Sequence, residues 1–298
     1  MNLFIIQGGF ELGCIFTILS LGLFISFKIL NIPDLTVDGS FTLGAAVSAM
    51  LTLAGHPFLG LAAALGCGGL AGAVTGILQT KLKVQYILSG ILTMTGLYSI
   101  NLRIMDKRPT ISLFGFDSIF TPFNQLFGSA YAKTIVLFLL VVLIIVFMLL
   151  FLKTQSGLAL RATGDNEVMV RASSINTDRM KILGLALANA LVALSGAVFA
   201  QHQSFADLSS GIGMMVIGLA SIIIGESLIN RKPLLVRLIS VAAGAIIYCY
   251  ILTIALQFGI EASDLKLLSA ILVTAAISIP SIQSAIAFRR RKGGRNHA

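Results

Sequence analysis

The sequence contains no tryptophan and few charged residues for its length. Only 11% of its 298 residues are charged, whereas 57% are apolar. A soluble domain has about 25% charged residues, so this chain has too few charges to keep a surface of this size in water. Without tryptophan, an aromatic belt at a membrane interface has to be built from tyrosine and phenylalanine. The composition excludes an ordinary soluble protein and indicates an integral membrane protein.

Cysteine and histidine are also scarce, with three residues of each kind. Cys14, Cys67 and Cys249 all lie in apolar runs, and their spacing is typical of neither a disulfide framework nor a metal site. No G-x-x-x-x-G-K-[ST], H-E-x-x-H or G-x-S-x-G motif occurs. We therefore expect no metal, no cofactor, no catalytic residues and no ATP site of the phosphate-loop type in this chain.

Uncharged apolar runs follow one another along nearly the whole chain. A helix that crosses a bilayer needs roughly 20 mostly apolar residues. Runs of that kind predict an all-α, polytopic transmembrane helical bundle of about 8–9 spans, with no room for strands and one transmembrane domain over residues 1–288. The candidate spans are Leu12–Phe27, Gly39–His56, Pro57–Thr80, Val84–Leu102, Thr134–Leu152, Ile182–Ala206, Leu208–Gly225, Leu238–Ile260 and Leu267–Phe288. The run Leu208–Gly225 is the weaker one, because it is rich in glycine and closed by Glu226.

The basic residues gather in short loops and at the C-terminus. The net charge is +9, but this distribution follows the positive-inside rule and does not indicate nucleic-acid binding. We expect the loop 154–179 and the basic tail 289–298 to be cytoplasmic and residues 106–132 to lie outside. This orientation puts three basic residues on the outer side, against the positive-inside rule: Arg103, Lys107 and Arg108. The side of the N-terminus stays open, because it depends on whether residues 31–40 leave the membrane.

One candidate span carries small residues at a strict spacing of four. Gly60, Ala64, Gly68, Gly72 and Gly76 lie along one ridge of Pro57–Thr80, which lets another backbone approach closely. The ridge predicts helix packing. Two interpretations remain, static packing within the fold or an interface with a moving helix or a second subunit.

The loop 154–179 is the longest cytoplasmic loop. Asp165 or Asn166 can cap a short helix that has Glu167 in its first turn, where a negative charge is favourable. One of residues 176–178 can cap the next span. A short helix held between two spans is suited to docking, since a push on it reaches both spans. The alternative is a plain solvated connector.

A second polar stretch lies at residues 31–41. Pro33 breaks a helix and Gly39 loosens one. Carboxylates at membrane depth are candidates for function. The alternative is a cytoplasmic loop in which Asp38 is the N-cap of the second span. The polar side chains of the stretch are Asn31, Asp34, Thr36, Asp38 and Ser40.

Over nearly its whole length, the chain resembles the permease subunits of bacterial ABC importers of the branched-chain amino acid, ribose and nucleoside group. Ser195–Ala200 resembles the small-residue helix that follows the coupling segment in that group. Residues 32–41 are similar to a narrower subset, whose permeases often accompany lipoprotein-type binding proteins for amino acids. Ser174 departs from the pattern, because the group usually has glycine there. The positions in 154–179 that resemble the group's coupling segment are Gly157, Arg161, Ala162, Gly164, Asp165, Asn166, Glu167, Arg171, Ala172, Ile175 and Asn176.

The resemblance implies a multi-pass protein of the bacterial cytoplasmic membrane that forms a dimeric pore. A P-loop ATPase subunit would dock on each coupling segment, and an extracytoplasmic substrate-binding (lipo)protein would deliver substrate. Glu167 and its neighbours would sit in the ATPase groove, and Arg161 and Arg171 would anchor the segment. We expect a homodimer, because nothing in the sequence suggests an asymmetric partner.

These expectations lead to alternating access driven by the partner's ATP hydrolysis. We expect the substrate to be an aromatic or branched-chain amino acid. Sugars and nucleosides are the less favoured alternatives. Asp34 and Asp38 are candidates for binding a substrate ammonium group. An ion-coupled secondary carrier and a membrane enzyme or scaffold are the alternatives from other classes. The candidate pathway residues are Asn31, Asp34, Thr36, Asp38, Ser40 and Gln201.

Overall fold

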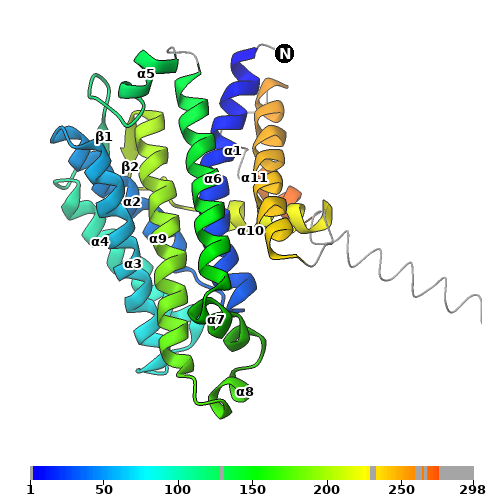
Figure 1. Ribbon diagram of the computed structural model, residues 1–298. Coiled ribbons are helices and arrows are strands. Elements are labelled where there is room, and N and C mark those ends of the chain that lie inside the picture. Colours follow the sequence, from blue (N-terminus) through cyan, green and yellow to red (C-terminus); the bar gives the residue numbers. More distant parts are fainter. Residues whose placement is uncertain (1–2, 128–130, 229–232, 259–263, 265–266, 275–298) are drawn as a thin grey trace, which may run out of the picture.

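The computed structural model describes residues 3–127, 131–228, 233–258, 264 and 267–274. In these ranges, seven helices are long and apolar enough to cross a membrane. The predicted all-α membrane bundle is confirmed (Figure 1). The long helices are α1 (Leu3–Leu23) with its π-helical continuation η1 (Phe24–Ile29), α2 (Thr36–Leu53), α3 (Pro57–Thr80), α4 (Tyr86–Ile104), α6 (Ala132–Lys153), α9 (Thr177–Gln203) and α11 (Leu234–Gln257). The shorter helices are α5 (Thr121–Phe127), α7 (Gln155–Asp165), α8 (Glu167–Ala172) and α10 (Met214–Leu228).

Several predicted bounds were wrong. The first span begins at Ile5, seven residues before Leu12, so Glu11 lies inside the helix and not at its edge. The second span begins at Thr36, because polar residues in a first helical turn are no obstacle to a helix. The run that begins at Leu208 becomes a helix of only 15 residues. Of the candidate span Leu267–Phe288, only residues 267–274 are described, and the tail 289–298 lies outside the described residues.

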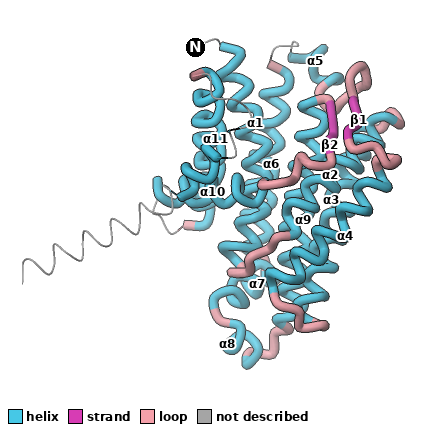
Figure 2. Tube along the Cα trace, turned by 180° about the vertical axis from the view of Figure 1, so that it is seen from behind, coloured by secondary structure: helices cyan, strands magenta, loops and turns pink. Residues whose placement is uncertain are grey.

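The two ends of the bundle differ. In both views, α7 and α8 lie at one end, whereas α5, β1, β2 and the start of α1 lie at the other (Figures 1 and 2). We call these the α8 end and the α5 end. The sequence left open on which side of the membrane the N-terminus lies. In the structure, α1 starts at the end of the bundle opposite to the predicted coupling segment.

The expectation that the chain has no strands was wrong. β1 (Thr110–Ser112) pairs antiparallel with β2 (Phe205–Asp207) near the α5 end (Figure 2). β2 follows directly after α9, which ends at Ser204 in a left-handed conformation, with φ of 59°. Each strand has only three residues, so neither could show the alternation by which strands are found in a sequence.

The core of the bundle is built around α9 and α1. α9 packs against α2 and α3, and α4 covers α2 and α3 from outside. On the other side, α1 packs against α6, α10 and α11. Buried residues fill α2 and the second half of α9 almost completely, whereas α4 and α6 expose much of their surface.

The small-residue ridge of α3 packs inside the chain. A methyl group added at Gly68 or Gly72 would overlap backbone atoms of α9, and one at Gly76 would come within 2.8 Å of Ile182. A methyl group at Gly60 would lie 3.2 Å from the backbone of Ser48 in α2, which is a tight contact. Close approach of α3 to α9 and α2 therefore depends on the missing side chains. The ridge is covered by these two helices and leaves no space there for a second subunit.

We predict that Gly72→Ala lowers the stability of the protein by about 1–3 kcal/mol, because the added carbon forces α3 and α9 apart. The measurement is the melting temperature of the purified protein in detergent. Gly66→Ala is the matched control on the same helix, since a methyl group there meets nothing within 4 Å. Equal melting temperatures for the two variants would contradict the packing role of the ridge.

Candidate functional site

The segment 154–179 contains two helices, α7 and α8, where the sequence predicted one. Each helix of this region has a side-chain cap at its start. Thr154 accepts a hydrogen bond from Gly157 N at 3.2 Å, and Asn166 accepts one from Met169 N at 3.1 Å. Asn176 caps α9 in the same way (Asn176 Oδ1 to Arg179 N, 3.0 Å). Of the capping residues that the sequence left open, Asn166 and Asn176 are the ones used.

Two glycines of α7 let this helix pack closely against α6 and η1. A methyl group at Gly157 would overlap the last turn of α6, and one at Gly164 would overlap the carbonyl oxygen of Ile29 in η1. Leu160 of α7 is fully buried and packs toward Gly184 of α9. Because α7 contacts α6, η1 and α9 at once, a displacement of α7 acts on three spans.

The helix α8 is tied to α9 by charges. Glu167 pairs with Lys181 at 2.7 Å and with Arg171 at 2.9 Å, and Arg171 also reaches Asp178 at 3.1 Å. The hydrogen bond from Lys181 holds the pKa of Glu167 below its usual value. Lys181 in turn donates to the hydroxyl group of Tyr86, the first residue of α4, at 3.1 Å. Glu167 is therefore turned inward, onto the bundle.

The outward face of α8 is apolar at its tip. Val168 is 80% exposed and Met169 is 70% exposed. Asp165 and Asn166 are exposed beside them, and Arg161 is partly buried. The sequence reasoning passed over Val168 and Met169, although two neighbouring apolar residues in a polar loop are a signal for a contact surface.

The loop between α8 and α9 contains Ser174, where the sequence departs from the pattern of the resembled group. This residue has φ of 61°, in the left-handed region that glycine adopts without strain. A glycine, which the resembled group usually has at this place, fits that conformation better than serine. Ser174 thus adopts a backbone conformation that favours glycine.

The two carboxylates of the second polar stretch bind backbone at interrupted helices. Asp34 is 1% exposed and accepts Thr36 N at 2.9 Å and Asn189 Nδ2 at 2.6 Å. Asp38 accepts Gly213 N and Met215 N, both at 2.9 Å, at the start of α10. The interpretation of Asp38 as N-cap of the second span was wrong, because α2 begins two residues earlier and Asp38 caps another helix.

The six candidate pathway residues do not form one site. Thr36 is buried and bonded to Thr75, which also bonds to Thr93. Ser40 is buried, Asn31 is exposed, and Gln201 binds Ser48, Pro57 O and Ile119 N. Asp38 lines a cavity together with residues of α4 and of the segment 207–212.

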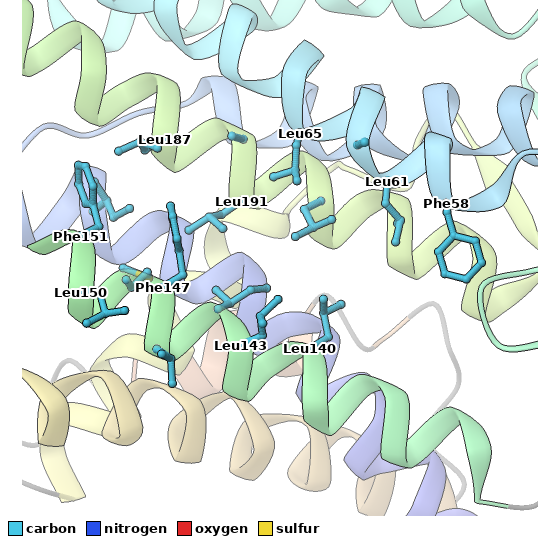
Figure 3. Close-up of a pocket in the computed structure, with 17 residues that line it drawn as sticks. Phe58, Leu61, Leu65, Leu140, Leu143, Phe147, Leu150, Phe151, Leu187 and Leu191 are labelled. Carbon is cyan, nitrogen blue, oxygen red and sulfur yellow. The ribbon is translucent and has the colours of Figure 1, made fainter. Parts of the chain in front are cut away.

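One groove, of about 710 Å³, is lined by apolar side chains. Figure 3 shows side chains of α3, α6 and α9 converging on it, among them Phe58, Leu65, Phe147 and Leu191. No side chain that lines it carries a hydrogen-bonding group. The groove therefore cannot bind the polar groups of a substrate, and its surface suits lipid.

A second cavity, of about 610 Å³, contains several polar side chains in a largely apolar lining, and we refer to it as the polar cavity. It lies between α2, α4 and the segment 207–212, and Asp38, Asn101 and Asp207 line it together with Tyr98. Asn101, Asp207 and Tyr98 were missed from the sequence, because Asp207 lies more than 100 residues after the two residues of α4. Asn101 carried the one usable signal, a carboxamide inside an apolar run.

One buried ionisable pair lies nearer the start of α1. Glu11 is 6% exposed, lies 2.9 Å from His202 of α9 and accepts a hydrogen bond from Thr134 of α6 at 2.6 Å. The pair joins three helices.

The sequence model of the family described as "Branched-chain amino acid transport system / permease component" matches residues 5–277 of this chain. A tyrosine transport system permease protein of Clostridioides difficile is 42% identical over 89% of this chain and 87% of its own length. An uncharacterized protein of Rickettsia prowazekii is 36% identical, over 87% and 92%. The ribose import permease protein RbsC of Escherichia coli is 25% identical, over 83% and 76%. No solved structure matches.

We predict that Lys181→Met loosens α8, because a charge-assisted hydrogen bond is worth about 1.5–3 kcal/mol. Hydrogen exchange of the amides of residues 167–178 should become about 10-fold faster or more. The double change Glu167→Gln with Lys181→Met should recover part of the protection, because it removes the unpaired carboxylate. Arg179→Gln, an exposed neighbour, is the control. Unchanged exchange in Lys181→Met would contradict the anchoring role.

Proposed function

Since this chain belongs to the family of the permease component of branched-chain amino acid transport systems, we propose that it is the membrane-spanning subunit of an importer that moves an amino acid with energy from a separate P-loop ATPase. The single observation that carries the coupling to an ATPase is the α7–α8 segment. It protrudes at one end of the bundle, has an exposed apolar tip and is bound firmly to the spans behind it.

The tip formed by Val168 and Met169 is the contact that we propose for the ATPase. In water, two adjacent side chains at 80% and 70% exposure are unfavourable, and a hydrophobic groove on a partner would cover them. Asp165 and Asn166 flank the tip, and Arg161 stands one turn before them. Glu167 and Arg171 hold the tip in place from behind, through Lys181 and Asp178.

Coupling then follows from the contacts of the segment. A push on α8 passes through Glu167 and Lys181 to α9, and through the hydroxyl group of Tyr86 to the start of α4. A push on α7 passes through Gly164 to η1. We propose that these spans tilt together when the ATPases close, which exposes the pathway alternately at the two ends.

This function fixes the orientation. The α8 end faces the cytoplasm of a bacterium, and the start of α1, α5 and the two strands face outward, toward an extracytoplasmic binding (lipo)protein. Two copies of the chain, each one domain over residues 1–288, form the pore as a homodimer with one ATPase each. The 42% identity to a permease whose name gives tyrosine as its substrate supports an aromatic amino acid as the substrate of this chain.

We predict that a P-loop ATPase co-purifies with the tagged chain from native membranes and is identified by its sequence. The double variant Val168→Asp with Met169→Asp should retain about one tenth of that ATPase or less, because charge cannot enter an apolar groove. Phe114→Asp is the control, since Phe114 is 88% exposed in the loop before α5. Equal ATPase recovery with the double variant and the control would exclude α8 as the docking helix.

The second candidate is an ion-coupled carrier, and the Glu11–His202 pair is the observation that favours it. A carrier of this kind needs an ionisable group inside the membrane. In the importer, the pair and Thr134 only hold α1, α6 and α9 together.

The two candidates differ in proteoliposomes. We predict that uptake of radiolabelled L-tyrosine requires the ATPase, the binding protein and ATP, and persists when an ionophore removes the proton gradient. The rate of uptake with Glu11→Gln should stay within about 3-fold of the rate with the native chain, because the oxygen of the neutral amide still accepts a hydrogen bond from Thr134. A 3-fold change corresponds to about 0.7 kcal/mol. Uptake without ATP that disappears with the gradient would establish the carrier.

A further inference from the structure

The polar cavity between α2, α4 and residues 207–212 has the size and chemistry of a binding site. Its volume of about 610 Å³ falls within the range of roughly 300–1,000 Å³ that small-molecule sites occupy. An amino acid with an aromatic side chain fits within it.

The charge of the cavity is negative. Asp38 and Asp207 line it, and no Lys, Arg or His does. Among the described residues, neither carboxylate forms an ion pair. Burial raises the pKa of Asp207, but hydrogen bonds from Ser209 and Thr110 outweigh it and hold the pKa below the usual value. A cavity with an uncompensated carboxylate attracts a positively charged group.

A buried acceptor without a partner stands in the same wall. Asn101 is 1% exposed and lines the cavity. Its Nδ2 donates to the carbonyl oxygen of Gly39 at 3.3 Å, while its Oδ1 has no partner in the described part of the chain. Each oxygen of Asp38 accepts one N–H from the start of α10 and can accept a further donor. These are acceptors suited to an ammonium group, which has three donors.

The rest of the lining is apolar. Met94 and Tyr98 of α4 face this cavity together with Pro109, Leu208 and Ile212. This lining can hold the side chain of an aromatic or large aliphatic amino acid, and the phenol ring of Tyr98 offers a stacking partner.

We propose that this cavity is a substrate site within the permease, which holds the ammonium group of an aromatic amino acid between Asp38 and Asn101 and its ring against Tyr98. The inference rests on the proposed import of amino acids. α4 links the site to the coupling segment, because Tyr86 at its start is bonded to Lys181. Movement of α4 against α2 opens or closes the space between their lining residues.

The test is equilibrium binding of radiolabelled L-tyrosine to the full-length permease in lipid nanodiscs. We expect saturable binding that L-phenylalanine displaces and 3-phenylpropionate, which lacks the ammonium group, does not. Tyr98→Ala and Asn101→Leu should each raise the Kd about 10-fold or more, which corresponds to about 1.4 kcal/mol. Ser99→Ala is the matched control, because Ser99 is exposed on the same helix and does not line the cavity, and its Kd should stay within about 2-fold.

The failure of this inference can be told from that of the proposed function by ATP-driven uptake with the assembled importer. If uptake of L-tyrosine is normal while the permease shows no binding, or binds 3-phenylpropionate equally well, the site is excluded and the import function stands. An equal Kd for Tyr98→Ala and Ser99→Ala would also exclude the site. Absence of any ATP-driven amino-acid uptake by the native assembly would overturn the function and the site together.

Discussion

The structure depends on satisfying backbone groups where helices are interrupted inside the bilayer. Lipid offers no hydrogen bonds, so each N–H and C=O freed by a break needs a partner in the protein. The chain has such breaks before α2 and before α10, and a carboxylate serves each of them. Asp34 accepts Thr36 N at the first break, and Asp38 accepts two N–H groups at the second. The carboxylates of Asp34 and Asp38 are thus first of all structural.

A carboxylate that caps a helix keeps acceptor capacity on its other side. This double use lets one residue stabilise α10 and still give the neighbouring cavity its charge. Lys181 also has two partners, because it pairs with Glu167 of α8 and donates a hydrogen bond to Tyr86 of α4. In the importer that we propose, coupling and substrate binding are therefore connected through one helix, α4, whose two ends take part in them.

Much of the fold could be predicted from the sequence, because every apolar run long enough to cross a bilayer has to be a helix there. The bounds failed where polar residues such as Thr36 and Thr177 open a helix. A helix in the segment 154–179 was predicted, but the inward turn of Glu167 was not, since its partner Lys181 had been placed outside the next span. The role of Asp38 was beyond the sequence, because its partners lie 175 and 177 residues later. The polar cavity was missed for the same reason.

The cap that Asp38 provides also bears on how the protein is made. α10 has 15 residues, too few to cross a bilayer of about 30 Å at 1.5 Å per residue. Its first N–H groups bond to a side chain of α2, which leaves the ribosome long before α10 does. α10 therefore cannot enter the membrane as an independent unit. It has to be received by a half-built bundle in which α2 is already in place, so the order of synthesis is also the order of assembly.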